Sequence, residues 1–216
     1  MWVFTSLEEV IYIHTATREA DFVREKLRNF KGVLVTDFYP AYDAINCAQQ
    51  KCLIHLMRDL NNDLMRDPYN VELKDLVQEF ALLLRPIIET VDRFGLRKRY
   101  LNKHKREVDC YYRKIAKVDV KSDIVSKYRV RFDKNRAKLF TFLDYDGVPW
   151  NNNNAEHAVK AFARIRHVLR GSSTDKGLRD YLVLLSICET CKARRINFLE
   201  FLRSREDDID MFSAHG

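Results

Sequence analysis

The hydrophobic pattern at the front of the chain is typical of short strands around one helix. Trp2–Thr5 and Val10–His14 are rich in β-branched and aromatic residues, and the stretch between them is short enough for a hairpin. Arg18–Phe30 repeats apolar residues at helical spacing behind Thr17, which suits an N-cap. Gly32–Asp37 is an apolar run that predicts a buried central strand with an acid at its carboxyl end.

The rest of the chain predicts one more strand and then helices. Tyr42–Cys47 favours a short helix and Cys52–Ile54 a short strand. The helices that follow are expected at residues 56–65, 71–94, 96–118 and 124–142, with a further helix starting in 151–154 and another at 175–192. Gly95 should end one helix, and Asp146–Pro149 should form a turn. The fold class is therefore α/β: a mixed sheet flanked by helices and interrupted by an all-α insertion.

Positive charge is concentrated in one part of the chain. The formal net charge is +7, but residues 93–138 contain 17 Lys and Arg against 5 Asp and Glu, a local net charge of +12. A focused positive field is typical of a protein that binds a polyanion, because neutralised phosphates release condensed counterions. A solvated helical face is an equal alternative.

Composition excludes a membrane-spanning or secreted disulfide-rich protein. The longest apolar run, Tyr181–Ile187, is too short to cross a bilayer, and the first residues lack a charged leader followed by an apolar stretch. The five cysteines are odd in number and lack the spacing of a disulfide framework, which favours free thiols in a reducing compartment. We expect a soluble, cytoplasmic protein.

Two acids stand where catalytic carboxylates are often found. Asp37 ends the predicted central strand, and Glu156 lies in the first turn of a predicted helix. A carboxylate at the end of a buried strand needs a cation, hydrogen bonds or a shifted pKa to offset its desolvation. Taken alone, an Asp after a strand is more typical of a turn or a helix cap, and Glu156 is also typical of an acid that the helix dipole favours.

The order of several short motifs resembles a known family. The motifs are Val33–Tyr42 (VLVTDFYPAY), Cys52–His55 (CLIH), Asn152–Ala158 (NNNAEHA), Arg170–Ser172 (RGS) and the helix at Tyr181–Cys191. Together they resemble the DDE transposases of insertion-sequence family sixty-six, from about Trp2 to Leu202. No single motif is decisive, and the resemblance rests on their joint order and spacing.

The resemblance implies a fold, a reaction and a cofactor. The fold would be RNase H-like, with core segments at residues 1–66 and 147–216 and a basic helical insertion at 67–146. Asp37 matches the second acid of the family and Glu156 the third, and the acids would bind two Mg²⁺ or Mn²⁺ ions that serve strand cleavage and strand transfer. The 118 residues between the two acids leave room for such an insertion.

The family's first acid has no counterpart here. It would lie on a strand before Trp2, whereas this chain begins at Met1, so the resemblance implies that the chain alone is inactive. Glu8 and Glu9 are poor substitutes because they lie in the predicted hairpin turn. Two alternatives to an active core stay open: a non-catalytic DNA-binding remnant, and an unrelated helical interaction module.

Further residues are candidates for supporting roles. Cys52 and His55 have half the spacing of a zinc site, which Cys188 and Cys191 could nominally complete, although a structural role for these residues is favoured. The Cys-x-x-His pair is part of the resemblance, as are Asn153 and Asn154 beside Glu156, and all four are candidate supporting residues.

Candidate DNA contacts fall in two regions. Lys160 and Arg164 share a helical stripe with Glu156, while Ala155, Val159, Phe162 and Leu169 should pack inward. Simple pairing of Glu156 with Lys160 is an equal alternative to a phosphate contact. Arg170 and Ser172 offer a phosphate contact at a helix junction, or else a C-cap followed by an N-cap.

The second region is the basic insertion, whose cations alternate with tyrosines around a helix. Its candidates are Arg97, Lys98, Arg99, Lys103, Lys105 and Arg106. Such a pattern favours contact with the DNA backbone over base recognition. The expected partners are insertion-sequence ends and target DNA at the bacterial nucleoid, and further copies of the chain when it is complete. No membrane and no small-molecule cofactor is expected.

Overall fold

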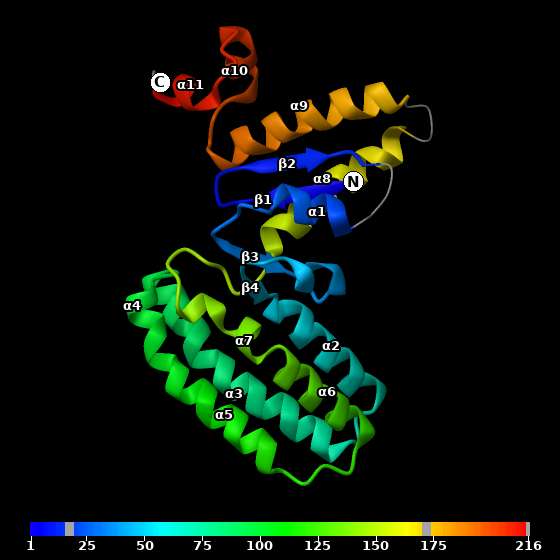
Figure 1. Ribbon diagram of the computed structural model, residues 1–216, viewed down its shortest axis with the longest axis vertical. Helices are drawn as coiled ribbons and strands as arrows, with labels where there is room; N and C mark the ends of the chain where they lie inside the picture. Colours follow the sequence, from blue (N-terminus) through cyan, green and yellow to red (C-terminus); the bar gives the residue numbers. More distant parts are fainter. Residues whose placement is uncertain (16–19, 170–173, 215–216) are drawn as a thin grey trace. The chain divides into compact units, whose positions relative to one another are not determined.

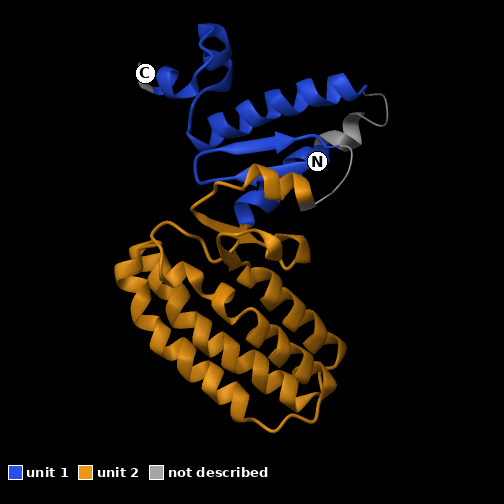
Figure 2. Ribbon diagram, in the orientation of Figure 1, with its two compact units in different colours: residues 1–19, 153–216 blue, residues 20–152 orange. Residues whose placement is uncertain are grey.

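The computed structural model describes residues 1–15, 20–169 and 174–214, and the chain divides into two compact units (Figures 1 and 2). Unit 1 comprises residues 1–19 and 153–216, and unit 2 comprises residues 20–152. This division places the second pair of strands together with the helical bundle. The predicted boundaries of the RNase H-like core and its insertion stay a prediction.

Unit 1 is built on an antiparallel hairpin. Strands β1 (Trp2–Thr5) and β2 (Val10–Ile13) pair with Trp2 opposite Ile13 and Thr5 opposite Val10, which confirms the predicted hairpin. Helices α8 (Asn153–Leu169) and α9 (Asp175–Ala193) pack on it, and α10 (Phe198–Ser204) and α11 (Ile209–Ala214) follow. The small core of the unit contains Tyr12, Ala158, Leu182 and Leu185.

Two hydroxyl groups of helix α9 form hydrogen bonds with the backbone at the outer edge of strand β2. Thr190 Oγ1 accepts a hydrogen bond from the Val10 amide at 3.1 Å and donates one to the Val10 carbonyl at 3.2 Å. One helical turn earlier, Ser186 Oγ accepts from the Tyr12 amide at 3.0 Å. Residues four apart on the helix thus match residues two apart on the strand.

Unit 2 begins with helix α1 (Ala20–Lys26) and a parallel strand pair. Strands β3 (Val33–Thr36) and β4 (Ala48–Lys51) pair with Thr36 opposite Lys51, and the 3₁₀ turn η1 (Pro40–Ala44) lies between them in sequence. Residues 33–35 are only half-buried, and among the described residues β3 pairs with β4 alone. The expected strand therefore forms, but without the two-sided burial of a central strand.

The prediction of a strand at Cys52–Ile54 is wrong. The strand lies four residues earlier, and Leu53 already begins helix α2 (Leu53–Arg66). Apolar character misled the prediction, because the buried residues of β4 are polar: Gln49, Gln50 and Lys51. Gln50, at 0% exposure, donates to the Leu139 carbonyl and accepts from the Phe142 amide, so its burial leaves no polar atom unsatisfied.

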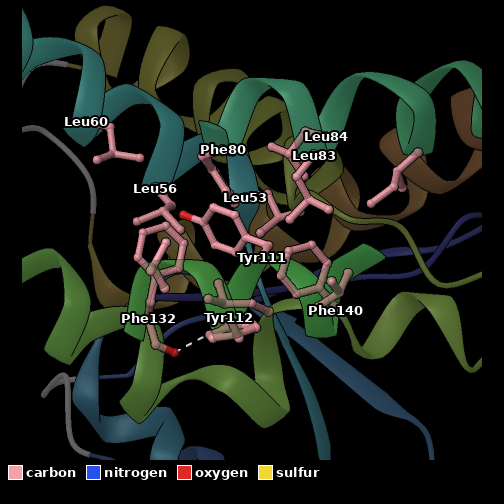
Figure 3. Close-up of a cluster of buried hydrophobic side chains, with 14 of the residues drawn as sticks. Leu53, Leu56, Leu60, Phe80, Leu83, Leu84, Tyr111, Tyr112, Phe132 and Phe140 are labelled. Atoms are coloured by element: carbon pink, nitrogen blue, oxygen red, sulfur yellow. Dashed lines mark hydrogen bonds between the residues drawn. The ribbon is translucent and has the colours of Figure 1, made fainter. Parts of the chain in front are cut away.

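The helical bundle of unit 2 forms its main core. Its elements are α2, α3 (Val71–Phe94), α4 (Lys98–Leu101), η2 (Asn102–His104), α5 (Lys105–Lys117), α6 (Asp123–Lys134), α7 (Arg136–Leu139) and η3 (Thr141–Leu143). Leucines of α2 and α3 surround an aromatic cluster centred on Phe80, Tyr111 and Phe132 (Figure 3). The Tyr112 hydroxyl donates to the Phe132 carbonyl within it.

The predicted helices of the bundle form, with breaks that the apolar pattern did not reveal. Helix α3 has the predicted bounds and ends at Gly95, whose φ of 69° lies in the left-handed region that glycine tolerates best. The helix expected over residues 96–118 is divided at η2, and the one over 124–142 is divided near Asn135. None of the described helices is both long and apolar enough to cross a membrane.

Candidate functional site

Asp37 lies directly beyond the carboxyl end of β3. Its Oδ1 atom accepts a hydrogen bond from the Tyr39 amide at 2.9 Å, which fixes the carboxylate at the turn into η1. Strand β4 is parallel to β3, so Cys52 follows at the same edge, and its amide donates to the Thr36 carbonyl at 2.7 Å. The sequence-based placement of Asp37 at a strand end is confirmed.

A buried lysine that the sequence did not single out lies beside this strand end. Lys51 is 1% exposed, and its Nζ lies 3.1 Å from Asp43 Oδ1 and 3.3 Å from Thr36 Oγ1. Asp43 Oδ1 also accepts from Lys138 Nζ at 3.0 Å. We call Lys51, Asp43 and Lys138 the buried charge cluster. A lysine at the end of a strand next to a candidate carboxylate would have indicated Lys51. The strand itself was not predicted, because its residues are polar.

Burial and charge within the buried charge cluster shift the pKa values of both Lys51 and Asp43. Burial lowers the pKa of Lys51, although the hydrogen bond and charge of Asp43 and the charge of Asp37 act in the opposite direction. Burial acts to raise the pKa of Asp43, but hydrogen bonds from Lys138 and Lys51 outweigh it, and the pKa is lowered. The cluster thus keeps Asp43 ionised and places positive charge close to Asp37.

Cys52 and His55 belong to the start of helix α2. Cys52 is fully buried, and its Sγ lies 3.4 Å from the Asn152 amide, while the Leu53 amide donates to the Trp150 carbonyl. His55 is the third residue of the helix and is half-buried. These bonds attach α2 to the segment before α8, which agrees with the structural role that the sequence favoured.

The cysteine pair of α9 belongs to unit 1. Cys191 is buried and Cys188 is half-buried, and burial raises the pKa of the Cys191 thiol. A raised pKa disfavours the thiolate form that binds zinc. All five cysteines, which lie within the described residues, are free thiols, as expected.

Glu156 lies in the first turn of α8 and is half-buried. Lys160 and Arg164 follow at helical spacing and are exposed, as the predicted stripe requires. Of the residues predicted to face inward, Phe162 packs against the core of unit 1, but Val159 is 46% exposed and Ala158 is buried instead, while the side chain of Leu169 lies outside the described residues. The Tyr12 hydroxyl donates to the Ala158 carbonyl at 2.8 Å, and this contact selects Ala158 as the inward residue.

The remaining sites flank Glu156 or fall beyond α8. Asn153 is the first residue of α8 and is half-buried, and Asn154 is exposed. Arg170 and Ser172 lie outside the described residues. Asp37 belongs to unit 2 and Glu156 to unit 1, and their convergence stays a prediction.

The donor chemistry suits a hard divalent cation, which prefers carboxylate oxygens. One oxygen of Asp37 is used by the Tyr39 amide, and the other makes no hydrogen bond to any described residue. Within residues 1–15, 20–169 and 174–214, no three His, Cys, Asp or Glu side chains form a cluster that could hold a metal ion. The candidate acids therefore fit a metal in type, and the described part of the chain does not assemble a complete ligand set.

The cations of the basic segment, residues 93–138, differ in whether they form ion pairs within the protein. Five of its cations form ion pairs within unit 2: Lys105 with Asp144, Lys114 with Glu79, Arg131 with Asp59, Arg136 with Asp109 and Lys138 with Asp43. Among the predicted DNA contacts, Lys105 is thus engaged within the protein. Arg97, Lys98, Arg99, Lys103 and Arg106 are exposed and form no ion pair with the described residues.

Comparison with known proteins defines the class. Residues 1–180 match the family described as Transposase IS66 family, so the match covers most of the chain. The chain belongs to this family of transposases, which supports a role in DNA transposition and confirms the resemblance seen in the motifs. No curated protein and no solved structure matches it.

Proposed function

We propose that this chain is the catalytic core of a DDE transposase with an RNase H-like fold, which cleaves DNA at insertion-sequence ends and joins the ends to target DNA. The observation that carries the proposal is the position of Asp37 in a chain of this transposase family. The carboxylate lies at the carboxyl end of a parallel strand, with one oxygen fixed by a backbone amide and the other available as a ligand.

The reaction consists of two phosphoryl transfers. Water first attacks a phosphodiester at the end of the element and breaks its P–O3′ bond, which leaves a DNA 3′-hydroxyl and a 5′-phosphate. This 3′-hydroxyl then attacks a phosphodiester of the target, forms a new P–O bond and releases a 3′-hydroxyl of the target strand. Mg²⁺ or Mn²⁺ bound by the carboxylates would supply positive charge to the attacking and leaving oxygens.

The side chains of this protein have distinct roles in the proposal. Asp37 and Glu156 are the metal ligands, and the amide of Tyr39 keeps the Asp37 carboxylate in one orientation. Lys51 forms an ion pair with Asp43 in the buried charge cluster beside the end of β3. Lys160 and Arg164 contact phosphates next to the scissile bond from the exposed face of α8.

Metal binding tests the ligand assignment without requiring activity. The apparent melting temperature of the protein should rise with Mn²⁺ concentration, because a ligand that binds only the folded state stabilises it by about 2.7 kcal/mol at a hundredfold excess over Kd. Asp37→Asn and Glu156→Gln should each remove most of this rise. The matched controls Asp92→Asn and Glu200→Gln, which change exposed acids on α3 and α10, should keep it.

Strand cleavage tests the reaction itself. The substrate is DNA with the terminal repeats of the family, and the enzyme is tested both as this chain and with additional upstream sequence that contributes a further strand and Asp. Cleavage that requires Mn²⁺ and is lost in Glu156→Gln would support the proposal. Cleavage that survives both Asp37→Asn and Glu156→Gln would show that the active site lies elsewhere. DNA binding with no cleavage and no metal binding would favour the non-catalytic remnant.

A further inference from the structure

One corner of the helical bundle is formed by a segment that is rich in positive charge and has no acid of its own, although Asp144 and Asp146 contact Lys105 and the Lys98 amide. Residues 93–106, which run from the end of α3 through α4 and η2 to the start of α5, contain seven Lys and Arg and no Asp or Glu. All seven side chains are exposed. Within the described part of the chain, only Lys105 of the seven forms an ion pair, with Asp144. The corner therefore presents a net positive charge to solvent.

The rest of the basic segment differs from this corner. Lys114, Arg131, Arg136 and Lys138 are ion-paired within unit 2. Arg129 donates to the carbonyls of Val118 and Ala116, so it closes the connection between α5 and α6. A cleft of about 410 Å³ near α5 and α7 contains Lys105 and Arg136, but Asp144 and Asp109 neutralise them there. These cations are therefore engaged by other groups of unit 2, whereas Lys117, Lys121, Lys127 and Lys134 form no ion pair with the described residues.

Two arginines of the corner are stacked on aromatic rings. The rings of Phe94 and Tyr100 are nearly parallel, with centroids 4.3 Å apart and an interplanar angle of 22°. The guanidinium carbon of Arg93 lies 5.2 Å from the centroid of Phe94, and that of Arg99 lies 4.5 Å from the centroid of Tyr100. The reversal at Gly95 brings the two rings together from the ends of α3 and α4. We call these four residues the arginine stack.

Hydrogen bonds hold the backbone next to the arginine stack. His104 is 3% exposed, and its ring nitrogens contact Thr90 of α3 and Glu107 of α5. The Lys98 amide donates to Asp146, and the Gly147 amide donates to the Leu96 carbonyl. The corner is therefore fixed to α3, to α5 and to the loop before α8.

The chemistry of the arginine stack suits phosphate. A guanidinium that stacks on a ring loses rotational freedom before it meets a ligand, and its N–H groups remain available at the edge of the plane. Phosphate oxygens accept such donors in pairs. A side chain ordered in advance also costs less entropy on binding than a free surface lysine.

We propose that the arginine stack, with Arg97, Lys98, Lys103 and Arg106 around it, is a preformed binding surface for the phosphodiester backbone of duplex DNA. The inference deepens the proposed function, on which its choice of DNA as the polyanion rests. It adds Arg93 to the predicted contacts and removes Lys105. It also assigns DNA binding to one corner and not to the whole basic segment.

Fluorescence anisotropy with a labelled DNA duplex tests the proposal, with the full chain in EDTA so that no metal ion contributes. Arg93→Gln with Arg99→Gln should raise Kd on the order of tenfold for two unrelated sequences, because phosphate contacts carry no sequence information. The slope of log K against log salt should fall by about 1.8, since each phosphate contact contributes about 0.9.

Two further double variants separate the arginine stack from net charge. Lys127→Gln with Lys134→Gln removes the same charge from exposed, unpaired positions of α6 within the described residues, and it should change Kd by less than about twofold. Phe94→Leu with Tyr100→Leu keeps every charge but removes the rings, and it should raise Kd by about threefold to fivefold. Circular dichroism verifies that each variant is folded.

The outcomes distinguish this inference from the proposed function. Unchanged affinity in the folded Arg93/Arg99 variant, or an equal loss in the Lys127/Lys134 control, would overturn the inference and leave the metal-binding and cleavage tests unaffected. Duplex binding lost in the Arg93/Arg99 variant alone would support the inference even if Asp37 and Glu156 bound no Mn²⁺. Failure of the unmodified chain to bind any duplex would overturn the inference.

Discussion

The Nζ atom of Lys51 lies 3.1 Å from Oδ1 of Asp43, and the lysine side chain is almost completely buried. Asp43 is partly exposed and has a second cationic partner, Lys138, whereas Lys51 has Asp43 as its single anionic contact among the described residues. Lys51 therefore depends on Asp43 for its ion pair more than Asp43 depends on Lys51. Loss of the acid would leave a buried cation without an anion, while loss of the lysine would leave Asp43 still paired.

This asymmetry predicts unequal effects of two substitutions. Asp43→Asn should lower the free energy of unfolding by about 3 kcal/mol, because a buried charge without its partner keeps its desolvation cost. Lys51→Met should lower it by about 1 kcal/mol or less, since an apolar side chain of similar length fills the site. Urea denaturation measures both. A larger loss for Lys51→Met than for Asp43→Asn would contradict the predicted order.

Asp43 should also contribute to acid unfolding. Its pKa is lowered in the folded state, so the unfolded chain takes up a proton there first as the pH falls. The stability that Asp43 contributes is complete well above its ordinary pKa of 3.8 and is lost as the pH falls through the lowered value. Denaturation curves measured at a series of acidic pH values should therefore be less pH-dependent in Asp43→Asn. Parallel pH profiles for the two proteins would refute this contribution.

The hydroxyl groups of α9 should stabilise unit 1. Ser186→Ala and Thr190→Val each leave a backbone amide of β2 without its acceptor, which costs about 1–3 kcal/mol where water does not replace it. Thr190→Ser keeps the hydroxyl and should cost less than Thr190→Val. Hydrogen exchange locates the effect, because the Tyr12 amide should exchange faster in Ser186→Ala. Unchanged exchange there would show that the hydroxyl does not protect the strand.

The aromatic cluster of unit 2 should dominate the stability of the bundle. Phe132 is fully buried, with ring centroids of Phe80 and Tyr111 at 5.1 and 5.6 Å. Phe132→Ala should lower the free energy of unfolding by about 3–5 kcal/mol, because it removes buried area and leaves a cavity. Val130→Ala on the same helix changes a residue that is 65% exposed and should have an effect within about 0.5 kcal/mol. Thermal unfolding of the two variants should differ clearly.

The sequence predicted those elements whose own residues carry the hydrophobic pattern. The hairpin and helix α3 were found because apolar residues recur there with the period of a strand or a helix. Strand β4 was missed because its buried residues, Gln49, Gln50 and Lys51, are polar and are held by hydrogen bonds and an ion pair and not by an apolar pattern. Gln50, for example, bonds to residues of α7 and η3, about ninety positions further along the chain. No local pattern encodes such partners.

The candidate site was predictable to a similar extent. The sequence placed Asp37 at the end of a strand and Glu156 in the first turn of a helix, and both positions are confirmed. It did not reveal Lys51, since the charge of this buried lysine is offset by Asp43, which belongs to another element. Nor did it separate the ion-paired cations from the exposed ones, because pairing depends on which helices become neighbours.

The hydroxyl groups of α9 also affect how the protein can associate. A strand with unsatisfied amides and carbonyls at its edge can pair with a strand of another chain, and this is a common route to aggregation. In β2 the amide and carbonyl of Val10 and the amide of Tyr12 already have partners on the helix. The hairpin is thus protected on that side from pairing with a strand of another molecule, without the charged or proline residues that more often guard an edge.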